Sequence, residues 1–150
     1  MVRRGISSRK KRVAANAGFA KRNYSYAEWT KDKFSEVVTV SGPAKLIFLA
    51  GVGAEDENGG GIRHKDDVAA QLRYAYRKIK RNLAQHGASF SDIVKMVTYV
   101  TDVRYFPICN QIRRETFGSA PLPAHTFLTI SQLAWPGMLI EIDVTAAIPG

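Results

Sequence analysis

Cysteine is nearly absent from this chain of 150 residues, because Cys109 is the only one. An intramolecular disulfide is therefore excluded, and a reducing compartment such as the cytoplasm is expected. Long hydrophobic runs are missing as well. The longest apolar stretches, such as residues 45–52, have the length of a strand, whereas a membrane helix needs roughly 20 apolar residues. The sequence therefore predicts no membrane span.

Histidine is scarce, and the three histidines, His64, His86 and His125, are too scattered for the ligand spacing of a zinc site. The glycine run 59–61 follows an acidic stretch and lacks a Lys-Ser/Thr continuation, so it is typical of a loop and not of a phosphate-binding motif. No Ser-His-Asp or Cys-His arrangement is evident, and Cys109 is expected to be a small buried apolar group. The sequence predicts no metal site and no bound cofactor.

Acidic residues are absent from the first 22 positions, which hold eight Lys/Arg. The rest of the chain keeps 14 of the 22 basic residues against all 13 acidic ones, so the N-terminal segment supplies eight of the nine net positive charges. We predict a basic arm over residues 1–22 and one domain over residues 23–150. The arm is typical of a solvated tail or of a segment packed along an oligomer, and RNA or an anionic surface is the alternative partner. It also resembles a mitochondrial presequence, which makes the mitochondrion the alternative compartment.

Hydrophobic residues make up 45% of the chain, enough for one core. Two β-rich runs, residues 36–41 and 45–50, are separated by Gly-Pro-Ala and predict a hairpin. Apolar residues then recur at spacings of three and four over residues 66–85, which predicts a helix. Asp66 or Asp67 caps its start, and Gly87 ends it.

The second half predicts a strand over 92–101, a helix over 105–117 and strands over 124–133 and 138–147. Pro107 is tolerated in the first turn of that helix, and Gly118 ends it. The predicted order is β-β-α-β-α-β-β, an α+β domain whose two helices cover one face of a mixed sheet.

The other face of this sheet is predicted to be apolar in places. On one register of the last strand it would carry Met138, Ile140, Ile142, Val144 and Ala146. Leaving such a surface in water costs about 25 cal/mol per Å² of apolar area. We therefore expect this face to pack against other copies of the chain in a homo-oligomer.

The C-terminal third carries the most informative motifs: Pro-Ala-His-Thr at 123–126, and Leu-Ala-Trp-Pro-Gly followed by an apolar-Glu-Ile strand at 133–142. The pattern resembles the reactive intermediate deaminase family, also called the RidA or YjgF family, whose signature is a Pro-Ala-Arg start, a turn and an apolar-Glu-Ile strand. The resemblance continues through residues 92–95, 106–110, 67–71, 49–51 and 24–27, and so covers about Tyr24 to Ile148.

This resemblance implies a chorismate-mutase-like fold, a homotrimer and three clefts between subunits that take a small-molecule ligand. Well-studied members hydrolyse enamines or imines to a carbonyl compound and ammonia without a cofactor. By position, Tyr24 would lie at the cleft wall, Asn110 beside the pocket, and Glu141 would hold or polarise the attacking water. His125 stands where active deaminases carry arginine, and Phe127 where some carry cysteine. Glu141 and His125 are the predicted catalytic pair; Tyr24, Asn110, His125 and Phe127 are the predicted ligand-binding residues.

Histidine at position 125 changes the expected chemistry. Arginine binds a carboxylate with a planar, permanently charged fork, and losing such a contact costs about 1.5–3 kcal/mol. Three alternatives follow: a different ligand, a His125 protonated by a neighbour such as Glu141, or a pocket that no longer deaminates. A metabolite-binding protein without catalysis, and RNA binding or cleavage aided by the arm, are the competing functions. Taken alone, His125 also fits a hydrogen-bonded structural role. Glu141 also fits the role of a charged residue that discourages pairing between exposed strand edges.

Overall fold

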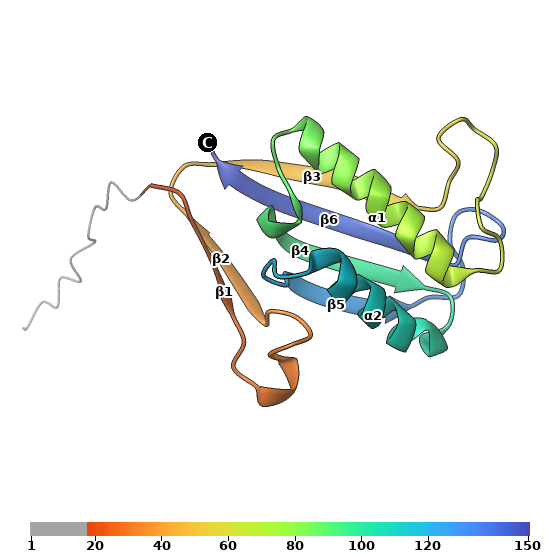
Figure 1. The fold of residues 1–150 in the computed structure, drawn as a ribbon, viewed down its shortest axis with the longest axis horizontal. Coiled ribbons are helices and arrows are strands. Elements are labelled where there is room, and N and C mark those ends of the chain that lie inside the picture. Colours follow the sequence, from red (N-terminus) through yellow and green to blue (C-terminus); the bar gives the residue numbers. More distant parts are fainter. Residues whose placement is uncertain (1–17) are drawn as a thin grey trace, which may run out of the picture.

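The computed structural model describes residues 18–150, so residues 1–17 of the predicted basic arm lie outside the described residues. Figure 1 shows the order of the elements. They are β1 (Ala20–Tyr24), β2 (Val37–Ser41), β3 (Ala44–Gly53), α1 (Val68–Gln85), β4 (Ile93–Val100), α2 (Phe106–Phe117), β5 (Ala124–Thr129) and β6 (Ile140–Pro149). The last residues assigned to the arm, 20–22, form part of β1.

The main sheet has four strands in the order β3-β6-β4-β5. Strands β4 and β5 run parallel, while β6 is antiparallel to both β3 and β4. Both α1 and α2 lie on the same face of this sheet (Figure 1). The prediction of an α+β domain with a mixed sheet and two helices is therefore confirmed.

The predicted hairpin of residues 36–50 is wrong. Strand β2 pairs with β1, from Ala20 opposite Ser41 to Tyr24 opposite Val37, and the two form a separate small sheet. Strand β3 pairs instead with β6. Gly42, with φ of +80°, does make the predicted bend, but the bend leads the chain from one sheet into another. A turn signal indicates where a chain changes direction, not which strands pair. Strand β1 was not predicted because its Lys-Arg-Asn centre lacks the alternation of apolar and polar residues that is typical of a half-buried strand.

Both helices follow their predicted signals closely. The Asp67 carboxylate accepts a hydrogen bond from the Ala70 amide (2.9 Å) at the start of α1, and Gly87 ends the helix with φ of +79°. The buried apolar stripe of α1 packs on the sheet and consists of Leu72, Ala75, Tyr76, Ile79 and Leu83. In α2 the buried stripe contains one charged residue, Arg113, beside Cys109, Ile112 and Phe117.

Alternation along β6 separates the two faces of the sheet. Ile140, Ile142, Val144 and Ala146 are buried in the core beneath the helices, which corrects the expectation that this register forms the uncovered face. Periodicity alone cannot say which of two faces the helices cover. The uncovered face, which we call the open face, is apolar through other strands: Leu46, Phe48 and Leu128 are exposed. Among residues 18–150, no helix is long and apolar enough to cross a membrane.

Candidate functional site

Three of the predicted site residues meet in a small cavity between β5 and α2. His125 and Phe127 come from β5 and Asn110 from α2; the rest of the lining consists of Leu72, Tyr76, Thr98, Phe106, Cys109 and Arg113. The space left for the centre of a water molecule is about 10 Å³. This is room for about one water, so the cavity is tight.

Strand pairing places these side chains on one face. The parallel register sets Met96 opposite His125 and Thr98 opposite Phe127. Because alternate residues of a strand point the same way, His125 and Phe127 share the helix-covered face with Thr98. The Thr98 hydroxyl lies 2.9 Å from His125 Nε2. His125 is therefore anchored within the sheet layer and faces α2.

Arg113, the most unusual group of the cavity, was not predicted from the sequence. Its side chain reaches the His125 ring from α2 and is only 3% exposed. It donates hydrogen bonds to His125 Nδ1, to the Lys33 carbonyl and to Asn110 Oδ1 (2.6 Å). The signal was available: Arg113 stands three residues after Asn110 and four before Phe117, which puts it on the buried stripe of the helix.

These contacts determine the protonation of His125. A guanidinium has only donors, so His125 Nδ1 must be an acceptor and the ring proton must sit on Nε2, which then donates to Thr98 Oγ1. Burial, together with the charges of Arg113 and Lys95, lowers the pKa of His125 to about 3. The imidazole is neutral at physiological pH, so this environment disfavours the second of the three alternatives, a protonated His125.

The cavity carries an unbalanced positive charge. Arg113 is the only charged residue in its lining. Burial lowers the pKa of Arg113, although arginine stays protonated in proteins. Burial also raises the pKa of the Cys109 thiol to about 12, so Cys109 is not a thiolate nucleophile at neutral pH.

Glu141 does not share this cavity within one chain. It pairs with Tyr99 and Gly53 on the open face, opposite the face that carries His125. Its carboxylate lies over Gly51, where an added Cβ would be 1.7 Å from Glu141 Oε1. Partial burial, followed by the charges of Glu55 and Asp143, raises the pKa of Glu141. The open face thus holds a carboxyl group with a raised proton affinity.

Tyr24 also lies outside the cavity. It ends β1, and its ring stacks on Tyr26 with centroids 6.3 Å apart and the planes 9° from parallel. The chain therefore brings together Asn110, His125 and Phe127, and leaves Tyr24 and Glu141 on other surfaces.

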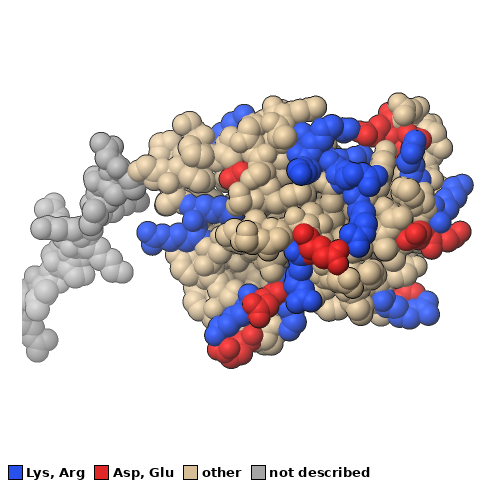
Figure 2. Space-filling view, in the orientation of Figure 1, with Lys and Arg blue, Asp and Glu red and all other residues tan. Residues whose placement is uncertain are grey.

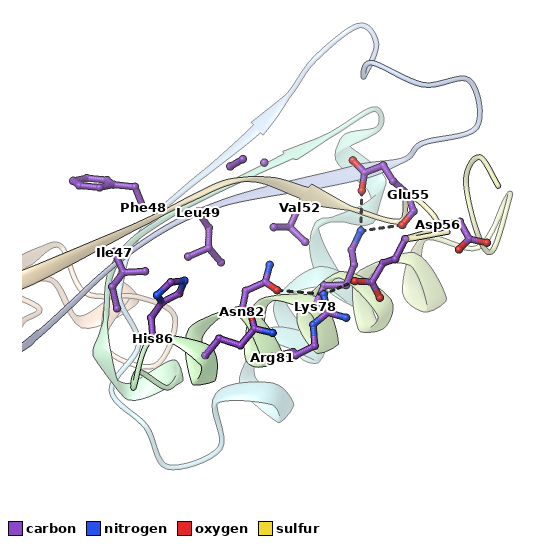
Figure 3. A pocket seen from close by; sticks show the side chains of 14 residues that line it. Ile47, Phe48, Leu49, Val52, Glu55, Asp56, Lys78, Arg81, Asn82 and His86 are labelled. Atoms are coloured by element: carbon purple, nitrogen blue, oxygen red, sulfur yellow. Dashed lines mark hydrogen bonds and ion pairs between the residues drawn. The ribbon is translucent and has the colours of Figure 1, made fainter. Parts of the chain in front are cut away.

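A larger groove of about 560 Å³ lies between β3 and α1 (Figure 3). Its charged side chains pair with one another: Lys78 Nζ lies 3.0 Å from Glu55 Oε2, and Arg81 contacts Glu57. Size alone does not make a site, and these mutually neutralised charges leave little to recognise a charged ligand. Within residues 18–150 no cluster of three or more His, Cys, Asp or Glu side chains is arranged to hold a metal ion.

Comparison of the sequence with known families and proteins gives a consistent result. The family described as Endoribonuclease L-PSP matches residues 27–148. A RutC family protein of Pyrococcus abyssi is 32% identical over 113 residues, which is 75% of this chain and 84% of the relative. The 3-aminoacrylate deaminase RutC of Acinetobacter baylyi is 29% identical over 119 residues, covering 79% of this chain and 92% of that enzyme.

The fold gives the same result. The crystal structure of YyfB from Yersinia pestis, a protein of unknown function in the conserved Rid protein family, superposes with a TM-score of 0.76. The superposition covers 85% of this chain and 98% of that one at 26% identity. The chain therefore belongs to the RidA/YjgF/L-PSP family, which also includes the RutC proteins.

Proposed function

We propose that this protein hydrolyses a small enamine or imine to a carbonyl compound and ammonia, in a cleft formed between subunits of a homotrimer. The observation that carries the proposal is the position of Glu141, a partly buried carboxyl group on the open face whose pKa is raised by burial and by the charges of Glu55 and Asp143. The likeness to a 3-aminoacrylate deaminase, whose named substrate is an enamine, supports this reaction class.

The cleft needs two chains because Glu141 and His125 lie on opposite faces of one sheet. The open face favours such an assembly: Phe48 is 72% exposed and Leu46 53%. Covering these side chains with a neighbouring subunit gains about 25 cal/mol for each Å² of apolar area removed from water. A neighbour whose open face approaches β5 would place its Glu141 beside the cavity of this chain.

In the proposed reaction, Glu141 moves protons between water and the substrate. For an enamine, the protonated carboxyl first delivers a proton to the terminal carbon, which yields the iminium ion and leaves the carboxylate. Water then adds to the iminium carbon while the carboxylate accepts one proton of the water, which gives a neutral carbinolamine. Glu141 passes this proton to the carbinolamine nitrogen and then accepts the hydroxyl proton as the C=O bond forms and the C–N bond breaks, so ammonia leaves and the carboxyl ends protonated, as it began. General acid–base catalysis of this kind contributes roughly 10²–10⁴-fold in rate.

The other residues would bind and orient the substrate. Asn110 gives its Oδ1 to Arg113, so its Nδ2 is available to donate to the ligand. Phe127 supplies an apolar wall, neutral His125 belongs to the floor, and Tyr24 would form the cleft wall across the interface. No step uses a metal or a cofactor.

Ammonia release from freshly generated 2-iminopropanoate tests the proposal. We expect Glu141→Gln to lower the rate at least a hundredfold while sedimentation still reports a trimer. Glu115→Gln, an exposed acid of α2, is the matched control and should keep the wild-type rate. Wild-type protein without ammonia release, or an unchanged rate in Glu141→Gln, would refute the assignment. Saturable binding of the same compound without turnover would instead favour a metabolite-binding protein.

RNA binding or cleavage is the second candidate, and one surface favours it. Helix α1 holds five Lys/Arg and no acid, and Figure 2 shows basic side chains gathered over this helix. The family description also names an endoribonuclease. Affinity for single-stranded RNA that falls steeply with salt, and falls further when residues 1–17 are deleted, would support it. We place it second because the α1 charges are partly neutralised, as in Arg73–Glu115 and Arg81–Glu57.

A further inference from the structure

Arg113 is a buried charge that has no counter-charge among the described residues. Its three hydrogen-bond partners are a backbone carbonyl, an amide oxygen and a neutral imidazole nitrogen. No carboxylate within residues 18–150 forms an ion pair with it, whereas Arg63, Arg73, Arg81 and Arg104 all have one. Burying an ion is costly unless it is paired, so this guanidinium is an incomplete ion pair.

One donor of Arg113 also lacks a partner. The Nε atom is buried and has no hydrogen-bond acceptor, the only buried side-chain nitrogen or oxygen of the described residues in this condition. A buried donor without an acceptor costs about 1–3 kcal/mol. The unpaired charge of the Arg113 guanidinium and its unpaired Nε–H donor together indicate that a negatively charged hydrogen-bond acceptor completes the site.

The partners that Arg113 does have hold it without neutralising it. Asn110 Oδ1, the Lys33 carbonyl and His125 Nδ1 fix the plane of the guanidinium, and none of them carries a negative charge. An aspartate in place of His125 would satisfy the same hydrogen bond and cancel the charge. The neutral imidazole, fixed in turn by Thr98, keeps the positive charge available to a ligand.

The rest of the cavity limits what this ligand can be. Phe106 and Phe127 meet edge to face with ring centroids 5.1 Å apart, and Phe106 is 42% exposed, so the aromatic pair forms the outer wall. The interior holds about one water. A small ligand can therefore place about one oxygen of an anionic group inside, at Arg113, while its apolar or uncharged remainder lies against the two rings at the mouth.

We propose that Arg113 is the anion-binding residue of this cavity, that it takes the carboxylate of a small monocarboxylic acid, and that His125 is its positioning residue. The inference rests on the proposed function for the identity of the site and adds the charged group of the substrate. Binding of the carboxylate is nevertheless measurable without turnover.

The experiment compares 2-oxopropanoate with its neutral amide, 2-oxopropanamide, by calorimetry on the full-length protein. The wild type should bind the carboxylate roughly ten- to a hundredfold more tightly, the range expected for one charge-assisted contact. Arg113→Met should lose this preference, and Arg113→Lys should keep part of it. Arg114→Met, which removes the exposed arginine next in the helix, is the matched control and should bind as the wild type does.

The role of His125 has its own readout. His125→Gln offers a neutral acceptor to Arg113 and should retain the preference for the carboxylate. His125→Asp should fold at least as well as His125→Gln but lose the preference, because the new carboxylate occupies Arg113. A purely structural His125 would make these two variants bind alike, which would overturn the positioning role.

Wild-type protein alone also decides the proposal if Arg113→Met fails to fold. The Arg113 Nε–H resonance should shift with 2-oxopropanoate and not with the amide. Equal affinity for the two compounds, or an unmoved resonance, overturns the inference. A preference for the carboxylate without ammonia release would retain this inference and reject the deaminase activity. Ammonia release without a preference for the carboxylate would retain the deaminase activity and reject this inference.

Discussion

His125 should make the stability of this protein depend strongly on pH between 7 and 5. Its pKa is about 3 in the folded chain, against an ordinary value of 6.5. A depressed histidine pKa means that the unfolded chain binds more protons over this interval, so stability is present near neutral pH and falls as the pH drops. From these values, the free energy of unfolding should decrease by about 2 kcal/mol between pH 7 and pH 5 through this residue alone.

Urea denaturation at a fixed protein concentration measures this effect, with His125→Gln as the perturbation. Glutamine can accept from Arg113 but does not titrate, so the variant should lack the 2 kcal/mol fall that the wild type shows. His86→Gln removes an exposed histidine and should keep the wild-type dependence. Other titrating groups act equally in all three proteins. Identical pH slopes in wild type and His125→Gln would refute the buried, neutral imidazole.

Three further predictions concern other parts of the chain. Gly51→Ala should displace the Glu141 carboxylate, since the new Cβ would be 1.7 Å from Oε1, and should lower deaminase turnover at least tenfold while the protein remains folded by circular dichroism. Phe48→Glu should shift the oligomer towards monomer in analytical ultracentrifugation, because it places a charge on the most exposed apolar side chain of the open face; an unchanged assembly would remove Phe48 from the interface. Asp67→Ala should lower the free energy of unfolding by about 1 kcal/mol through loss of the α1 cap, and Asp66→Asn, which leaves the cap intact and keeps a residue suited to the φ of +62° at this position, should have a smaller effect.

Local signals predicted the helices well, and pairing signals predicted the strands less well. In α1 one apolar stripe, one capping acid and one terminal glycine all agree, so the prediction needed no tertiary information. The pairing of β1 with β2 and of β3 with β6 depends on contacts distant in sequence. The Gly-Pro turn between β2 and β3 suggested a hairpin that the sheet registers exclude.

In the candidate site as well, local motifs were predicted from the sequence and contacts between distant segments were not. The motifs identified Asn110, His125 and Phe127, which do share one cavity. Arg113 was overlooked because an arginine is normally a surface residue, and only its helical spacing marks it as buried. The relation between His125 and Glu141 could not be predicted, because a shift of one residue in strand register exchanges the two faces of a sheet.

The central claim, a cleft that combines Glu141 of one chain with the Arg113 and His125 cavity of another, is tested most directly by subunit mixing. Glu141→Gln and Arg113→Met proteins are each expected to be inactive alone. Refolded together at equal amounts, they should recover about one quarter of the wild-type ammonia release, because one cleft in four then receives both intact residues. Mixed oligomers that form but remain inactive would contradict the account.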